Sequence, residues 1–160
     1  MSGLPIPIEA LYGAWRLVSE RRTILETGET VDTAPDNAPS GYISYSRDGR
    51  FLGLIVRGTR PRATDIAAIT DDQGTQLFRS MISYGARFEF DGYTVVHHID
   101  ISWNETWTGT TQVRDVSRDG DRLIYRTRPA PHYIDGKPSI GILVWERVGD
   151  GKEGPPSPPL

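Results

Sequence analysis

The chain has 160 residues, of which 37% are hydrophobic, and it carries a formal net charge of −3 and no cysteine. A chain of this length can bury roughly two-thirds of its unfolded surface, so we expect one domain with a hydrophobic core. The weak negative charge and the lack of a basic patch interleaved with aromatic residues argue against a nucleic-acid partner. The lack of cysteine excludes disulfides, thiolate metal sites and cysteine nucleophiles.

The composition also bears on location and fold class. The N-terminal segment has no basic region followed by an apolar run, so it does not resemble a signal peptide, and no stretch is long and apolar enough for a membrane helix. We therefore expect a cytoplasmic protein with no membrane partner, although a chain without cysteine is also compatible with export. The 17 glycines and 12 prolines favour a β-rich fold with many turns.

In chain order, a helical turn is expected at residues 8–13 and a first strand at residues 14–25. Three Asp-Gly dipeptides then separate strand-like runs, at residues 48–49, 91–92 and 119–120. Asp-Gly suits tight turns that need a positive φ and that link antiparallel strands, so each predicts a hairpin. The strand-like runs are residues 41–46, 50–58, 84–90, 93–103, 107–117, 121–128 and 139–148. About eight strands result, the number that closes into a ligand-sized barrel.

Residues 70–83 favour a short helix instead of a strand. Asp71 or Asp72 is the expected N-cap, and the helical spacing places three apolar side chains near one face. These side chains are Leu77, Met81 and Ile82. The preceding residues 58–72 form either a lid over the mouth of a barrel or an ordinary crossover, and we favour the crossover.

The C-terminal residues 149–160 contain four prolines and no apolar periodicity. This composition predicts a disordered tail after a single domain formed by residues 1–148. A proline-rich ligand for another protein is the alternative interpretation of the same segment.

Several stretches together resemble the lipocalin-like domain family, a group of small intracellular barrels of the calycin type. The matching stretches are "GAWRLVS" (13–19), "GYISYSRDGR" (41–50), "YGARFEF" (84–90), "VVHH" (95–98), "WTGTTQVR" (107–114), "DGDRL" (119–123) and "VWERV" (144–148). The resemblance implies an all-β fold, an antiparallel up-and-down barrel of about eight strands with one short helix and an internal cavity. It also implies that Trp15 lies at the closed end of the barrel and that Arg147 packs across its indole ring.

Alternation along residues 93–103 assigns the two faces of this strand. The odd positions carry the apolar set, so Val95, His97, Ile99 and Ile101 are expected to face the barrel interior. His97 is then either a neutral core histidine held by hydrogen bonds or a titratable group at a cavity wall that is suited to proton transfer. We favour proton transfer, because the fold supplies a cavity.

The neighbouring His98 is expected on the outer face, where it can pair with Asp100 at little energetic consequence. Because adjacent residues on a strand point to opposite faces, His97 and His98 cannot readily chelate one ion. A metal site made of His98, Asp100 and the distant His132 stays an alternative, but no oriented three-ligand set is visible, and we expect no metal.

A polar wall is expected opposite the apolar one. The resemblance retains Gln112 and Arg114, which implies that both point inward, where the guanidinium can bind a carboxylate or enolate oxygen through paired hydrogen bonds. If they point outward instead, they form only a solvated face. Tyr45, Tyr84 and Tyr125 are also expected inside; each alone is best explained by packing, but together they form the aromatic wall of a small-molecule site.

These residues lead to a functional hypothesis. We expect the barrel to bind a small, largely apolar organic molecule and to act on it as a cofactor-independent cyclase, isomerase or lyase. The expected catalytic residues are His97, Arg114 and Tyr84. The expected substrate-binding residues are Gln112, Tyr45, Phe88, Val95, Ile99 and Tyr125. Some relatives look associated with natural-product pathways, but the resemblance carries no shared catalytic signature, and this part is fold-level analogy.

Two other classes of function fit the same sequence. A carrier protein needs the cavity but no chemistry, and an interaction module needs neither, because its barrel is packed shut. Several converging inward polar groups favour an enzyme, one or two favour a carrier, and none favours a solid barrel. The sequence has no dinucleotide fingerprint and no phosphate-binding loop, so we expect no NAD, ATP or haem, and it does not indicate an oligomeric state.

Overall fold

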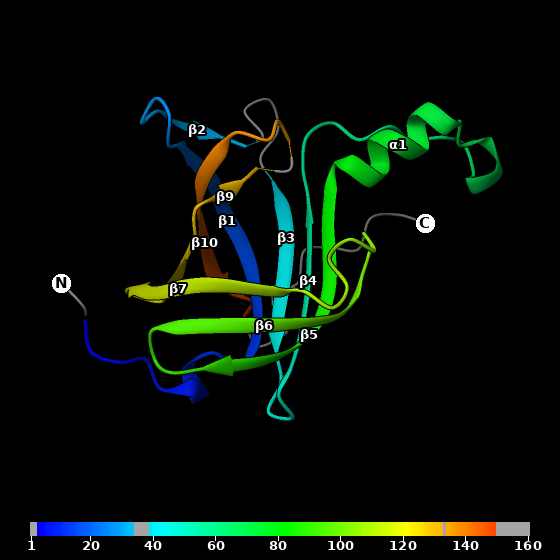
Figure 1. Cartoon of the computed structure of the whole chain (residues 1–160). Coiled ribbons are helices and arrows are strands. Elements are labelled where there is room, and N and C mark those ends of the chain that lie inside the picture. The colour runs from blue at the N-terminus through cyan, green and yellow to red at the C-terminus, as the bar shows by residue number, and fades with distance from the viewer. Residues whose placement is uncertain (1–2, 34–38, 133, 150–160) are drawn as a thin grey trace.

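The computed structural model describes residues 3–33, 39–132 and 134–149. Eight antiparallel strands form a closed barrel, because the first of them pairs with the last (Figure 1). They are β1 (Gly13–Ile24), β3 (Ser40–Tyr45), β4 (Arg50–Val56), β5 (Met81–Phe90), β6 (Thr94–Ser102), β7 (Thr111–Asp119), β8 (Arg122–Thr127) and β10 (Pro138–Arg147). The short strands β2 (Thr30–Asp32) and β9 (Ala130–Pro131) pair with β1 and β10. The expected all-β barrel is thus confirmed, whereas the expected tail lies, from residue 150 onward, outside the described residues.

The three predicted Asp-Gly hairpins are present. Gly49 joins β3 to β4, Gly92 joins β5 to β6, and Gly120 joins β7 to β8. Their φ angles are +84°, +97° and +59°, the region that glycine adopts without strain. The turn chemistry therefore sets three of the seven connections between successive barrel strands.

The predicted helix is present as α1 (Asp71–Arg79), but its expected boundaries were wrong at both ends. Its N-cap is Thr70, whose hydroxyl accepts a hydrogen bond from the backbone N–H of Gln73. The Gln73 side chain accepts in turn from the Thr70 backbone, and this reciprocal capping box outcompetes a cap by Asp71 or Asp72. Met81, expected on the helix, instead begins β5, as Ile82 continues it.

Outside the barrel strands, the described helical elements are short. η1 (Ile8–Ala10) is the expected helical turn before β1, and η2 (Ile66–Ala68) lies on the crossover between β4 and α1. Figure 1 shows α1 outside the barrel, next to the start of β5. Among the described residues, no helix has the length and apolar character needed to cross a membrane.

One end of the barrel is closed by a tryptophan and an arginine, as the resemblance implied. The Trp15 indole N–H donates to the Leu11 carbonyl at 2.9 Å, and the Arg147 guanidinium lies 4.3 Å from the centre of the Trp15 ring. Arg147 also donates to the carbonyls of Ala10 and Tyr12, at 2.6 and 2.7 Å. All the observed contacts of Arg147 serve to hold η1 and the start of β1 against the last strand.

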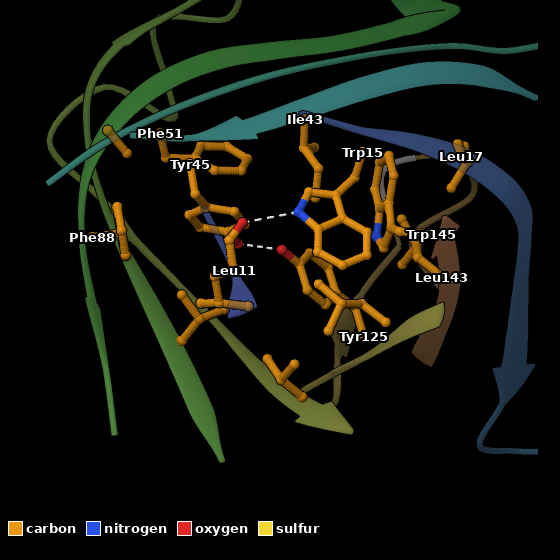
Figure 2. Packing of buried hydrophobic residues seen from close by; sticks show 14 of the residues in the cluster. Leu11, Trp15, Leu17, Ile43, Tyr45, Phe51, Phe88, Tyr125, Leu143 and Trp145 are labelled. Carbon is orange, nitrogen blue, oxygen red and sulfur yellow. Dashed lines mark hydrogen bonds between the residues drawn. The ribbon is translucent and has the colours of Figure 1, made fainter. Parts of the chain in front are cut away.

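The core above this end is aromatic. Figure 2 shows Tyr45 and Tyr125 pointing toward one another inside the barrel, while the Leu11 carbonyl faces the indole nitrogen of Trp15. Leu11 is fully buried and Tyr45 is 1% exposed, so this end of the barrel is closed to solvent. The cavity must therefore lie in the other half of the barrel.

Two β-bulges change which side chains face inward. On β6 the pairing with β5 passes from Ala86–Ile99 to Gly85–Ile101, so Asp100 is the extra residue. Beyond the bulge, Ile101 is 66% exposed and lies over Gly85, and our expectation that it faces inward was wrong. A second bulge lies on β1 at residue 18. It reverses which side chains face inward and outward in the second half of that strand.

Candidate functional site

A cavity of about 500 Å³ occupies the half of the barrel opposite Trp15. Its wall is mainly apolar, and the barrel is therefore not packed shut. The apolar and aromatic lining comes mainly from β3, β4, β5 and β10 and includes Ile43, Phe51, Ile55, Ile82, Leu143 and Trp145. The polar lining includes Glu20, Arg57, Tyr84, Gln112, Arg114, Tyr125, His132 and Ser139. A largely apolar pocket with a few polar groups is the usual form of a small-molecule site.

The register of β6 and β7 places the polar wall. His97 pairs with Gln112, and Val95 pairs with Arg114. Residues directly opposite on antiparallel strands point to the same face, so Gln112 and Arg114 point inward with His97. Both side chains line the cavity, which answers the question that the mixed polarity of residues 107–117 left open.

Arg114 is the cation of this wall and is half-buried. Its Nη1 donates to the Gln112 side-chain oxygen and to the Val113 carbonyl, both at 3.1 Å. In the part of the chain that the structure describes, its other two nitrogens make no hydrogen bond and no carboxylate pairs with it. A guanidinium has five N–H donors, so most of them stay available toward the cavity.

Four side chains next to Arg114 form a continuous hydrogen-bonded chain. The Tyr84 hydroxyl lies 2.7 Å from His97 Nδ1, and the Tyr45 hydroxyl lies 2.8 Å from His97 Nε2. Tyr45 in turn hydrogen-bonds to the Tyr125 hydroxyl. The two outer members, Tyr84 and Tyr125, line the cavity, whereas Tyr45 and His97 lie in the core behind them.

The environment holds every member of this chain in its neutral form. Burial, and then the positive charge of Arg114, keep the pKa of His97 well below its usual value. Burial raises the pKa of Tyr84, and burial together with Tyr125 raises the pKa of Tyr45 well above that of a free tyrosine. Burial also raises the pKa of Tyr125. The chain is therefore a network of neutral donors and acceptors.

Packing fixes the imidazole ring as well. The Phe51 ring stacks on His97 with centroids 3.9 Å apart and an angle of 20° between the planes. Phe51 is positioned by Gly53, two residues along β4, where an added Cβ would lie 2.9 Å from the Phe51 ring. The small residue on the cavity wall thus makes room for the ring that holds His97.

The structure separates the nine expected site residues into two groups. Four of them line the cavity: Tyr84, Gln112, Arg114 and Tyr125. The other five are buried in the core beside it: Tyr45, Phe88, Val95, His97 and Ile99. His97 is only 1% exposed, so it does not reach the cavity and can act on a ligand only through the tyrosines.

Several cavity residues were missed by the sequence analysis. Glu20 faces inward because of the bulge at residue 18, which alternation counted from Trp15 cannot reveal. Glu20 forms an ion pair with Arg57 in which both side chains are 6% exposed. The only available signal was the "SERR" run, whose consecutive polar residues break the expected alternation in the second half of β1.

A further charged group lies at the same end of the cavity. Arg22 donates to both carboxylate oxygens of Asp135, and this contact lowers the pKa of the Asp135 carboxyl. Burial, followed by the nearby charges of Arg22 and Arg57, lowers the pKa of His132 to about 4. These residues, with Glu20, give the outer end of the cavity a set of charges that largely compensate one another.

The outer strand face differs from the sequence-based expectation. His98 contacts Glu89 at 2.7 Å, and Asp100 is bound by Arg50 at 2.6 and 2.8 Å, so the two do not pair with each other. The bulge at Asp100 accounts for this difference, because it turns that side chain toward β4. Within the described ranges, no group of three or more histidine, aspartate and glutamate side chains is placed to hold a metal ion.

Sequence comparison agrees with this architecture. Curated proteins compared with the chain give no match. The lipocalin-like domain family matches residues 12–148, which include all eight barrel strands and both ends of the hydrogen-bonded chain. The barrel, its internal cavity and this match together place the chain in the lipocalin-like domain family.

Proposed function

We propose that this barrel binds a small, largely apolar organic molecule that carries a carboxylate or carbonyl oxygen, and that it acts on this molecule as a cofactor-independent acid–base enzyme. The observation that carries the proposal is Arg114, a half-buried cation at the cavity wall without a carboxylate partner among the described residues. Partial burial without a counter-charge is unfavourable for a cation, so an anionic ligand group would compensate it.

The chemistry follows from the groups next to Arg114. Tyr84 lines the cavity and can give or take a proton through its hydroxyl, while Arg114 and Gln112 stabilise negative charge that develops on the ligand oxygen. This combination supports reactions in which a proton leaves a carbon next to a carbonyl group. Isomerisation, cyclisation and elimination of carbonyl compounds can all begin in this way, and we propose an isomerase, cyclase or lyase.

The indole N–H of Trp145 supports a bound ligand independently. Trp145 lines the cavity, and its buried nitrogen has no hydrogen-bond partner among the described residues. Buried donors are nearly always satisfied in proteins, so a ligand acceptor would satisfy this N–H after a small movement of the indole toward the cavity.

Binding is tested with a pair of fluorescent probes that differ in charge. 8-Anilinonaphthalene-1-sulfonate carries an anionic group, whereas N-phenyl-1-naphthylamine has the same rings without it. We expect both to bind, and we expect Arg114→Met to weaken the sulfonate about 10- to 100-fold while the uncharged probe changes less than about threefold. If each probe binds Arg114→Met as tightly as it binds the native protein, Arg114 is excluded as the anchor.

Catalysis is tested with phenylpyruvate, an aromatic acid whose keto and enol forms differ in the position of one proton. We expect the protein to accelerate ketonisation of the enol, followed by its ultraviolet absorbance, and we expect Tyr84→Phe to remove the acceleration. The carrier alternative predicts instead that the acid binds without any acceleration and is recovered unaltered. That result would assign the cavity to transport or storage.

A further inference from the structure

The hydrogen-bonded chain has an unusual topology for a buried polar network. It starts at the cavity with Tyr84, passes through His97 and Tyr45 in the core, and returns to the cavity with Tyr125. Buried tyrosines that serve packing alone need one partner each for the hydroxyl. Here both nitrogens of one neutral histidine are bound, so the two ends of the chain are coupled through its ring.

A neutral imidazole has one N–H donor and one acceptor nitrogen, so the chain has only two fully satisfied arrangements. In the first, Tyr84 donates to Nδ1, Nε2–H donates to Tyr45, and Tyr45 donates to Tyr125, whose own proton points toward the cavity. In the second, every bond is reversed: Tyr125 donates to Tyr45, Tyr45 donates to Nε2, and Nδ1–H donates to Tyr84, whose proton then points toward the cavity.

We propose that Tyr84, His97, Tyr45 and Tyr125 form a reversible proton relay, in which the two neutral tautomers of His97 alternate. The relay takes a proton from one atom of a bound carbonyl compound at Tyr84 and returns one to another atom at Tyr125. This inference rests on the proposed function, and it narrows the reaction to isomerisation by proton relocation.

The proton balance of one turnover is closed. The C–H bond next to the carbonyl breaks and its proton goes to the Tyr84 oxygen, while the Tyr84 proton moves to Nδ1 of His97. The Nε2 proton moves to Tyr45, the Tyr45 proton moves to Tyr125, and the Tyr125 proton forms the new bond on the substrate. The electron pair stays on the substrate, where Arg114 holds the oxygen. After release, Tyr84 gives one proton to cavity water and Tyr125 takes one up.

Burial explains why the relay uses neutral groups. A charged imidazolium or phenolate would be expensive among these side chains, and Arg114 further disfavours the imidazolium. Simultaneous transfer along the chain creates neither species. Tyr45 and His97 are accordingly positioning residues that carry protons between the two tyrosines that contact the substrate.

The tautomer of His97 can be read directly by ¹⁵N NMR of histidine-labelled protein. Tyr84→Phe removes the acceptor for Nδ1–H, so we expect the Nε2–H tautomer, in which every remaining donor keeps a partner. Tyr125→Phe leaves Tyr45 with Nε2 as its only acceptor in the chain, so we expect the Nδ1–H tautomer. Phenylalanine keeps the ring packing in both, and Tyr42→Phe, on the exposed face, serves as the matched control.

Opposite tautomers in the two variants support the relay, and the same tautomer in both overturns it. A second measurement uses Tyr45→Phe, which interrupts the chain without touching the cavity lining. We expect kcat for phenylpyruvate ketonisation to fall at least about 100-fold, with the affinity for 8-anilinonaphthalene-1-sulfonate unchanged. Ketonisation that survives Tyr45→Phe overturns the relay but leaves the proposed function intact. Opposite tautomers without any ketonisation by the native protein instead refute the catalytic function and leave the reversible chain in place.

Discussion

The closed end and the cavity of this barrel each contain an arginine beside aromatic rings, yet the two are used differently. Arg147 stacks on Trp15 and donates to two backbone carbonyls. Among the described residues, Arg114 makes two hydrogen bonds, both from one nitrogen, and it lines the cavity. The first arginine therefore has its interactions within the protein, while the second keeps donors for a partner.

The same contrast holds for the aromatic groups. At the closed end the indole N–H of Trp15 is satisfied by Leu11, whereas at the cavity the indole N–H of Trp145 has no partner among the described residues. A protein that needed only stability would satisfy both. The comparison indicates that one half of the barrel was shaped for folding and the other half for a ligand.

The largest expected effect is on stability at the closed end. Trp15 is 3% exposed, and we expect Trp15→Ala to lower the free energy of unfolding by about 3–5 kcal/mol because it leaves a large cavity. Denaturant titration measures the loss. Trp107→Ala, at the half-buried cavity wall, is the matched control and should cost clearly less. Equal losses would remove the distinction between a structural and a functional half.

The two arginines provide the next test, because the same substitution should have opposite consequences. Arg114→Met should weaken anionic ligands by about 1.4–2.7 kcal/mol, with little loss of stability, since an unpaired cation is removed. Arg147→Met should lower the melting temperature and leave the affinity of the folded protein unchanged. Thermal unfolding measures the melting temperature of both variants, and probe titration measures their ligand affinity. The same change in both variants would show that the two arginines share one role.

A smaller effect is expected from pH. Because burial keeps the pKa of His97 well below 6.5, the unfolded chain takes up a proton below about pH 6.5 that the folded protein does not. Stability should therefore fall as the pH falls, by up to about 1.4 kcal/mol per pH unit for this histidine. Denaturant titrations between pH 7 and pH 5 measure the slope, and His97→Gln should reduce it. An unchanged slope would mean that His97 is charged in the folded state.

The smallest effect is expected on the outer face. Arg50 and Asp100 form a paired contact, but their side chains are 42% and 53% exposed. Asp100→Asn should shift the melting temperature by less than about 2 °C, because solvent screens such pairs. A larger shift, measured by calorimetry, would indicate that this pair fixes the bulge beside it and thereby the orientation of Ile101.

The barrel could be predicted from local sequence features, while the site could be predicted only in part. Asp-Gly turns and strand alternation are local, and they are strong enough to define the hairpins. Alternation also placed the His97 side chain inside. It could not show that Phe51 and two tyrosines enclose the ring, because those contacts join residues 13 to 52 positions apart.

The errors in assigning strand side chains to the inner or outer face have one common cause. Alternation assumes an unbroken strand, and a single extra residue reverses the assignment beyond it. The bulge at Asp100 moved Ile101 outward, and the bulge at residue 18 moved Glu20 inward. The "SERR" run after residue 18 is the only local signal for the bulge on β1, and no local signal marks Asp100. The ion pair of Glu20 with Arg57 spans 37 residues. Such contacts follow from the register of the closed barrel.

Gly53 has a consequence for how this protein can diverge. An alanine methyl at this position would lie 2.9 Å from Phe51 and 3.4 Å from Ile43, and Phe51 is the ring that stacks on His97. A substitution that shrinks the pocket would therefore also displace the histidine. In descendants of this sequence, the size of the accepted molecule and the chemistry performed on it would tend to be inherited together at this position.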